Sequence, residues 1–285
     1  MSRVEQQSDF LMQMAHGSQM RLLEAQAKVA TNEIERLANE QLPAPAFRLS
    51  ADGFDLIAEV KKHSPSAGEL ADENLVPAAQ AAQYAAAGAA AISVLTEPSR
   101  FAGSLGDLRD VVACVGDVPV MRKDFLVDPY QVFEARAAGA GGVLLIAAIL
   151  EPEVLKEMLS ISFDLGMFAL VEAFDVADLE RCVPVMEALL PGLANDRPER
   201  MLLGINCRNL RTLEVEFGRF AELAGKLPAG IPWAAESGVA TPEDAASVAQ
   251  AGYRLALVGT ALMQADNPSA AAAALLQAGR AAAAC

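Results

Sequence analysis

Six short apolar runs in this chain each end in a polar or charged residue or in glycine, and helical-looking segments separate them. A buried parallel strand has this continuous apolar pattern. If such strands close into one barrel, their C-terminal ends converge on one mouth. Polar residues far apart in the sequence would then share one pocket. The six runs are 57–61, 119–124, 168–172, 202–206, 232–238 and 255–259.

Strands and helices alternate along most of the chain. The alternation favours βαβ units, and eight of them fit a (β/α)8 TIM barrel better than an open doubly wound sheet. The 285 residues suit one such barrel of about 250 residues, although two domains of about 150 would also fit. Strands are predicted at 54–60, 91–95, 118–122, 142–147, 167–172, 201–206, 231–236 and 255–259. Helices are predicted at 73–87, 105–115, 128–138, 151–164, 175–189, 215–226, 241–251 and 268–283.

Residues 1–50 are predicted to form a helical extension packed on a catalytic barrel domain of residues 51–285. Within them, 19–40 has the 3.6-residue rhythm of an amphipathic helix, which Pro43 would end. This helix would either cap the bottom or edge of the barrel or help to cover its mouth. Further along, the Pro-, Gly- and charge-rich segment 190–200 predicts a surface loop.

Composition excludes several classes of protein. The net charge of −15 argues against nucleic acid and anionic membranes as partners. No apolar run reaches the roughly 18 residues of a membrane span, and the N-terminus lacks a signal-peptide layout, so a soluble, cytoplasmic protein is expected. The four cysteines show no C-x-x-C spacing, and with two histidines they make a metal or redox site unexpected.

Charged residues at the first and third strand ends are the first candidates for chemistry. Glu59 and Lys61 share a strand face and would either form a salt bridge at the barrel top or take part in a reaction. A polar loop at 62–68 follows them and is of the kind that closes over ligands. At the third strand, Arg122 and Lys123 must face opposite ways, and periodicity does not say which enters the barrel.

The later strand ends supply a base and anion-binding groups. Glu172 is a candidate general base. Asn206 and Arg208 are two residues apart, so they point to the same side, and their donors suit a carboxylate or an oxyanion. The segments 236–238 and 258–261 end the last two strands with small residues. Together with a short helix expected near 262–264, they match the phosphate site that recurs after strands seven and eight of such barrels.

Motifs at these strand ends and in the loops after them occur together in one known family. They are 57–61 (IAEVK), 64–66 (SPS), 93–96 (SVLT), 101–104 (FAGS), 122–125 (RKDF), 170–172 (LVE), 205–210 (INCRNL), 236–238 (ESG) and 257–259 (LVG). With them the chain resembles indole-3-glycerol-phosphate synthase over roughly 54–263. The resemblance implies a carboxy-lyase of tryptophan biosynthesis that works without metal or organic cofactor. It would convert 1-(2-carboxyphenylamino)-1-deoxyribulose 5-phosphate into indole-3-glycerol phosphate, releasing CO₂ and water.

The resemblance also implies a role for each candidate residue. Lys123, and not Arg122, should enter the barrel as the acid that polarises the ribulose carbonyl. Glu172 and Glu59 would manage protons in the dehydration, and Lys61 would be an anion ligand and a second acid. Asn206 and Glu236 would position the anthranilate part with Arg208, while Ser64, Ser237, Gly238, Gly259 and Thr260 would bind the rest of the substrate, the last four at its phosphate.

Two other functions remain open from the residues alone. Lys123 is also the nucleophile that a Schiff-base, aldolase-like enzyme on the same barrel would need. The fold would equally allow a non-catalytic binder of a phosphorylated metabolite, because fold does not fix function. The expected partner in every case is a small phosphorylated molecule, and a monomer is expected.

Overall fold

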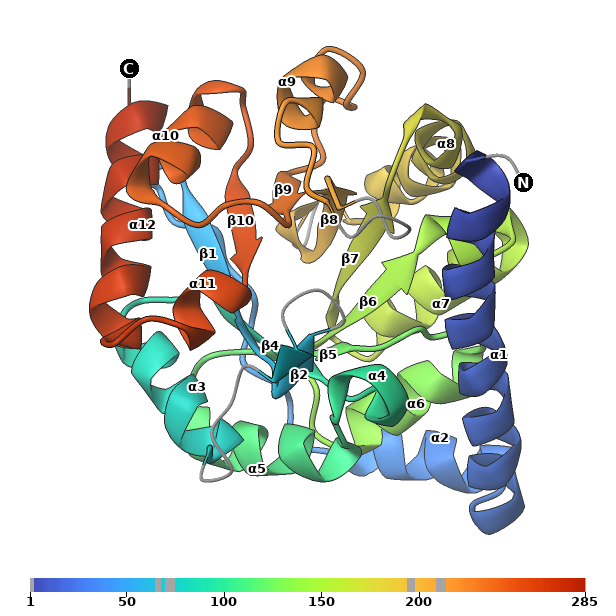
Figure 1. The fold of residues 1–285 in the computed structure, drawn as a ribbon. Helices are drawn as coiled ribbons and strands as arrows, with labels where there is room; N and C mark the ends of the chain where they lie inside the picture. Colours follow the sequence, from blue (N-terminus) through green and yellow to red (C-terminus); the bar gives the residue numbers. More distant parts are fainter. Residues whose placement is uncertain (1–2, 65–67, 70–74, 194–197, 209–213, 285) are drawn as a thin grey trace.

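Eight parallel strands close into one barrel in the computed structural model, which describes residues 3–64, 68–69, 75–193, 198–208 and 214–284 (Figure 1). The order around the barrel is β1-β10-β9-β8-β7-β6-β5-β4, so that the first and last strands pair. This confirms the predicted (β/α)8 barrel. Its strands are β1 (Asp55–Val60), β4 (Ala91–Leu95), β5 (Val120–Lys123), β6 (Gly142–Ile146), β7 (Phe168–Ala173), β8 (Met201–Asn206), β9 (Trp233–Glu236) and β10 (Leu255–Val258).

Helices follow the strands and cover the outside of the barrel (Figure 1). Prolines occupy the first helical turn of many of them, where the missing N–H has no helical partner to lose. The covering helices are α3 (Pro77–Ala86), α5 (Leu105–Val115), α6 (Pro129–Ala137), α7 (Pro152–Asp164), α8 (Val176–Leu193), α9 (Arg219–Ala224), α10 (Pro242–Gln250) and α12 (Pro268–Ala283). Shorter elements are β2 (His63–Ser64), β3 (Gly68–Glu69), α4 (Pro98–Phe101), η1 (Ala147–Ile149), η2 (Pro198–Arg200) and α11 (Thr260–Met263).

The core has two layers, which explains why the strands are apolar on both faces. One side chain set, including Leu56 and Ala58, packs between strands and helices. The alternate set, including Ile57 and Leu170, fills the barrel interior. Phe47, from the segment before β1, stacks on Phe168 at the start of β7 with ring centroids 4.6 Å apart. The segment before the first strand therefore closes the barrel floor, away from the mouth.

An extra helical segment precedes the first strand, as predicted, but it is two helices and not one. They are α1 (Arg3–Lys28) and α2 (Thr31–Glu40), and Figure 1 shows them meeting at an angle. Pattern analysis missed the first half of α1 because it is mostly polar. The two helices take different places, since α2 packs on α6 whereas α1 reaches the mouth side of the barrel.

The predicted loop at 190–200 is wrong at its start. Helix α8 continues through Pro184 and Pro191 to Leu193, whose side chain is buried in the core. The free energy gained by this burial offsets the loss of the hydrogen bond that proline removes from a helix. Residues 194–197 lie outside the described part of the chain, and Pro198–Arg200 forms η2. No helix among the described residues is long and apolar enough to cross a membrane.

Candidate active site

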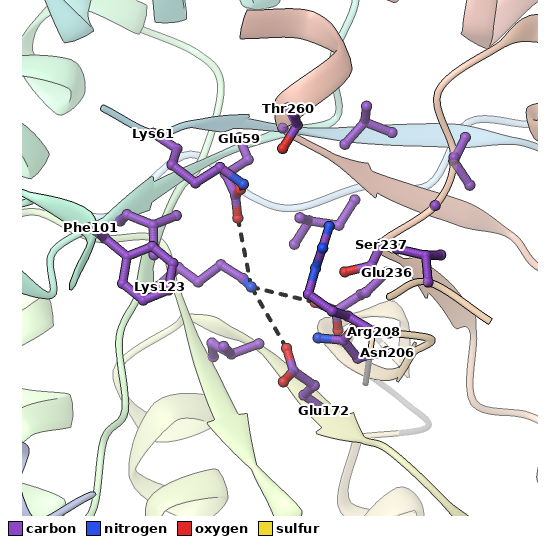
Figure 2. A pocket seen from close by; sticks show the side chains of 18 of the residues that line it. Glu59, Lys61, Phe101, Lys123, Glu172, Asn206, Arg208, Glu236, Ser237 and Thr260 are labelled. Carbon is purple, nitrogen blue, oxygen red and sulfur yellow. Dashed lines mark hydrogen bonds and ion pairs between the residues drawn. The ribbon is translucent and has the colours of Figure 1, made fainter. Parts of the chain in front are cut away.

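A cavity of about 300 Å³ opens at the C-terminal ends of the barrel strands (Figure 2). It lies where parallel-barrel enzymes carry their active sites. The predicted site residues that line it are Glu59, Lys61, Lys123, Glu172, Asn206, Arg208, Glu236, Ser237, Gly238, Gly259 and Thr260. The remaining one, Ser64, lies in the short strand β2, where it pairs with Gly68. The centre of the adjacent predicted loop, 65–67, lies outside the described residues.

Lys123 occupies the centre of this cavity. Its Nζ lies 3.6 Å from Glu59 Oε2, 3.7 Å from Glu172 Oε2 and 3.7 Å from Glu236 Oε2 (Figure 2). The three carboxylates come from β1, β7 and β9, so only barrel closure brings them together. One ammonium group thus stands among three acids that are far apart in the sequence.

Arg122 points the other way, into the layer between the barrel and α6. Its Nη1 lies 2.7 Å from Glu134 Oε2, and its Nη2 lies 3.3 Å from Asp124 Oδ2. Lys123 is therefore the residue that points into the barrel, and Arg122 points outward. Strand alternation alone had left this choice open.

The surroundings of Lys123 keep its amine protonated. Burial lowers the pKa of Lys123, but the charges of Glu172, Glu59 and Glu236 together raise it further, so that the net shift is upward. An amine with a raised pKa is an ammonium ion at neutral pH and has no free lone pair for attack on a carbonyl. The site therefore disfavours imine formation, and the ammonium group can give its proton only to a strong base such as a developing alkoxide.

The carboxylates around Lys123 differ in their protonation. Burial raises the pKa of Glu59, but the charges of Lys61 and Lys123 outweigh it and the net pKa is lowered. Burial and the charge of Glu172 raise the pKa of Glu236 well above its ordinary value, and Lys123 offsets only part of this. A side-chain hydrogen bond with Glu172 adds to the upward shift, and the Lys123 ammonium lies 3.7 Å from Glu236 Oε2. The cavity thus holds an ionised base in Glu59 and a carboxyl group in Glu236 that retains its proton more tightly.

Asn206 and Arg208 line the side of the cavity next to Glu236 (Figure 2). The Arg208 backbone N–H donates to Asn206 Oδ1 at 3.0 Å, and Arg208 pairs with Val215 in an isolated antiparallel bridge. Burial lowers the pKa of Arg208, and Glu59 offsets part of this effect. A guanidinium beside an amide provides donors for a carboxylate or an oxyanion.

The ends of β9 and β10 form a corner suited to an anion. Ser237 and Gly238 both have positive φ, at +63° and +98°, which turns the backbone sharply after Glu236. Across the corner, Thr260 begins the short helix α11, which starts two residues before the predicted one. The first N–H groups of a helix have no partner within the helix and can face a ligand. Gly259 has a second reason to lack a side chain, because a Cβ there would overlap the Glu59 carboxylate.

The apolar wall of the cavity was not predicted, although Phe101 and Phe125 belong to the quoted motifs 101–104 and 122–125. Phe101 and Phe125 lie on it with ring centroids 6.2 Å apart, and Phe10 from α1 lies the same distance from Phe125. Apolar walls of this kind suit an aromatic ligand. Strand-end periodicity could not indicate these rings, because Phe101 ends the short helix α4, Phe125 lies in the loop after β5 and Phe10 lies in α1.

A buried polar network, also missed, ties α1 to the mouth. Arg21 Nη2 donates to Asp124 Oδ1 at 2.6 Å, and its Nη1 lies 3.5 Å from Glu97 Oε1. Glu97 in turn accepts N–H bonds from Ser99 and Arg100 at the start of α4. Arg21 therefore joins the N-terminal helix to the residue that caps α4, which ends at Phe101, and to the loop after β5, which carries Phe125.

The chain matches the family model described as "Indole-3-glycerol phosphate synthase" over residues 11–275. It is 50% identical over 228 residues to the indole-3-glycerol phosphate synthase of Beutenbergia cavernae, covering 80% of this chain and 79% of that protein. It is 43% identical over 260 residues to indole-3-glycerol phosphate synthase 1 of Streptomyces coelicolor, covering 90% and 91%. Among solved structures it is similar to 3-hexulose-6-phosphate synthase from Salmonella typhimurium. The TM-score there is 0.57 at 13% identity, covering 80% of this chain and 99% of that one, which supports the fold alone.

Proposed function

Because this chain belongs to the indole-3-glycerol phosphate synthase family, we propose that the groups around Lys123 carry out the ring closure of that family. The protein is a carboxy-lyase of tryptophan biosynthesis. It converts 1-(2-carboxyphenylamino)-1-deoxyribulose 5-phosphate into indole-3-glycerol phosphate, CO₂ and water. The assignment of residues to steps is our inference from the site.

The observation that supports it most is the ammonium group of Lys123 among three buried carboxylates. In the first step the aromatic carbon that bears the carboxylate attacks the ribulose ketone and forms a C–C bond. The ketone oxygen becomes an alkoxide and needs a proton in the transition state. Lys123 donates it, because it is charged and lies at the cavity centre.

Loss of CO₂ follows and restores the aromatic ring with the electrons of the broken C–C bond. Tight binding of the substrate carboxylate would oppose this step, since only interactions stronger in the transition state accelerate a reaction. Arg208 and Asn206 orient the anthranilate part, while the nearby carboxylate of Glu172 limits how strongly a further negative charge is held. The apolar wall at Phe101 and Phe125 receives the aromatic ring.

Dehydration completes the indole, and it needs an acid and a base together. The hydroxyl leaves as water after gaining a proton, and a proton is lost from the five-membered ring. Lys61 and Glu59 form an acid–base pair at 2.8 Å on one face of β1, and Glu172 lies on the other side of Lys123 as a further base. Which carboxylate takes the ring proton follows from substrate orientation.

The phosphate belongs in the corner formed by Ser237, Gly238, Gly259 and Thr260, where backbone N–H groups and the start of α11 favour an anion. Ser64 remains a proposed contact from the loop after β1. We further infer a cytoplasmic monomer that binds neither nucleic acid nor membrane, with residues 1–50 as an extension of the catalytic barrel 51–285.

Mixing the protein with the carboxyphenylamino-deoxyribulose phosphate and following indole fluorescence tests the residue assignment. We expect Lys123→Met to reduce kcat by about 10²–10⁴-fold, the usual contribution of a positioned acid. The exposed lysine variant Lys156→Met should behave as the unmodified protein. Turnover by Lys123→Met at the unmodified rate would refute the role of Lys123.

Borohydride trapping separates this role from the Schiff-base alternative. A protonated Lys123 should show no reduced adduct by mass spectrometry after incubation with substrate, whereas an aldolase-like nucleophile would become modified at that lysine. Ligand-induced stabilisation without any fluorescent product would instead support a non-catalytic binder.

A further inference from the structure

Gly204 lies in the middle of β8 at a position where a side chain would collide with the site. A Cβ built there would overlap Glu236 Oε1 and would lie 3.0 Å from Glu236 Cδ and 3.1 Å from Leu170 Cδ1. Gly204 also stands in register with Glu172 on the adjacent strand β7. The missing side chain therefore leaves a slot that the Glu236 carboxyl group occupies, next to the position of Glu172 on β7.

We propose that Gly204 is a positioning residue for catalysis, because its lack of a side chain leaves the slot in which the Glu236 carboxyl group sits between Glu172 and Lys123. The inference rests on the proposed function, in which Glu236 takes part in the reaction. Gly204 itself contacts no reacting atom and acts through Glu236 alone.

Glycine is an unfavourable choice in this place unless space is needed. It weakens a strand interior and often marks a close approach by another group. Leu170 and Leu202, which point into the barrel near it, are large and buried, whereas Ala234, in register with it on β9, is small but still has a Cβ. The group that fills the space at Gly204 is the carboxyl of Glu236, which is 1% exposed.

The same arrangement recurs at a second carboxylate. A Cβ at Gly259 would overlap Glu59 Oε1 and would lie 3.1 Å from Glu59 Cδ. Glu59 is on β1 and Gly259 follows β10, the strand next to it. Two of the three acids around Lys123 thus have a glycine beside their carboxyl group, on or just after the neighbouring strand. The recurrence indicates that the acidic side chains need this space, and that the glycine is not a peculiarity of β8.

A side chain at Gly204 would displace the Glu236 carboxyl group from Lys123 and Glu172. Displacement of about 1 Å at a reacting group can reduce a rate about a hundredfold. Movement away from Glu172 would also remove part of the charge effect that raises the pKa of Glu236. The maximal kcat would therefore fall, and the pH dependence of kcat would change with it.

The test is a double-mutant cycle with a shorter acid. We expect Gly204→Ala to reduce kcat about a hundredfold and to move its pH profile. Glu236→Asp ends one methylene earlier and so stops before the overlap. In the Glu236→Asp background, Gly204→Ala should therefore reduce kcat less than threefold, by the general coupling of residues in contact. If the kcat reductions of the two single variants simply multiply in the double variant, the proposal is overturned.

Gly142→Ala in β6 is the matched control, because the three atoms nearest to its Cβ would all belong to the apolar ring of Phe168. It should lower the melting temperature and leave the pH profile of kcat unchanged. An equal change of pH profile in Gly142→Ala would show that general barrel strain, and not Glu236, is the cause.

If Gly204→Ala is too unstable for kinetic measurements, the change in its melting temperature still decides the question. In a Glu236→Ala background the overlap disappears, so Gly204→Ala should leave the melting temperature close to that of Glu236→Ala. An equal loss of melting temperature in both backgrounds would assign the collision to Leu170 and overturn the proposal. Unmodified kcat in Glu236→Gln would instead remove the role of Glu236 itself, which is a distinguishable failure of the proposed function.

Discussion

Lys61 Nζ lies 2.8 Å from Glu59 Oε1, and both side chains project from one face of the end of β1. The other oxygen of the same carboxylate lies 3.6 Å from Lys123 Nζ. Glu59 is therefore shared by two lysines. The salt bridge that the sequence left as one alternative is present, and the proposed chemical role would use the same carboxylate.

Lys61→Met should change the pH dependence of the reaction. The charges of Lys61 and Lys123 lower the pKa of Glu59 against the effect of burial, so loss of one charge raises this pKa. If Glu59 must be ionised, the acid limb of the kcat/KM profile should then move to higher pH. Lys62→Met is the control, because Lys62 pairs with Asp107 at 2.7 Å and not with Glu59. An acid limb that stays in place would argue against Glu59 as the base.

Glu236→Gln should stabilise the fold at neutral pH while it impairs turnover. The pKa of Glu236 is raised above 4.5 in the folded state, so its contribution to stability is full below about pH 4.5 and is lost as pH rises through the folded pKa. Glutamine has no such loss, and we expect a gain of about 1–2 kcal/mol at pH 7.5 that vanishes near pH 4. Urea unfolding at both pH values measures it.

The exposed control Glu153→Gln on α7 should show no such pH-dependent difference. A Glu236→Gln protein that is less stable than the unmodified one at pH 7.5 would contradict the raised pKa.

Ser237→Gly should weaken substrate binding and stabilise the fold. Ser237 has φ +63°, a left-handed conformation that costs a residue with a side chain about 1–2 kcal/mol, of which the entropy of glycine cancels part. We expect the free energy of unfolding to increase by about 0.5 kcal/mol. The loss of a hydroxyl donor to a charged phosphate should raise KM about tenfold. Ser237→Ala should raise KM equally without the gain in stability, and an unchanged KM in both would place the phosphate elsewhere.

Arg21→Met should loosen the N-terminal helix from the mouth. Asp124 is nearly inaccessible and would lose one partner, but Arg21 is 27% exposed, so solvent screening limits the effect. A double-mutant cycle with Asp124→Asn, measured by urea unfolding, should give a coupling energy of about 1 kcal/mol. Arg36→Met on α2 removes only exposed ion pairs and should have little effect. Additive losses at Arg21 and Asp124 would refute the coupling.

The strand ends could be predicted because a parallel barrel places them at one edge, whatever their separation in the sequence. Glu59, Glu172 and Asn206 were found in this way. The choice between Arg122 and Lys123 could not be made by pattern alone, because adjacent strand residues face opposite sides and both are basic. Only the resemblance to a family indicated the side that the structure has.

Other features depend on contacts that no local pattern records. Phe10 and Arg21 reach the site from a mostly polar helix, and their partners Phe125 and Asp124 are more than a hundred residues away. The first four residues of the predicted loop at 190–200 are helical because Leu193 is buried, a tertiary effect that outweighs local proline signals. The slot at Gly204 is likewise visible only when Glu236 is in place.

The contact between Gly259 and Glu59 crosses the junction where the last strand meets the first. During synthesis Glu59 emerges early, but the backbone that completes its seat arrives only when almost the whole chain has been made. A nascent or truncated polypeptide that lacks β10 would therefore carry every lysine and glutamate of the centre and still be unable to hold them in a working arrangement.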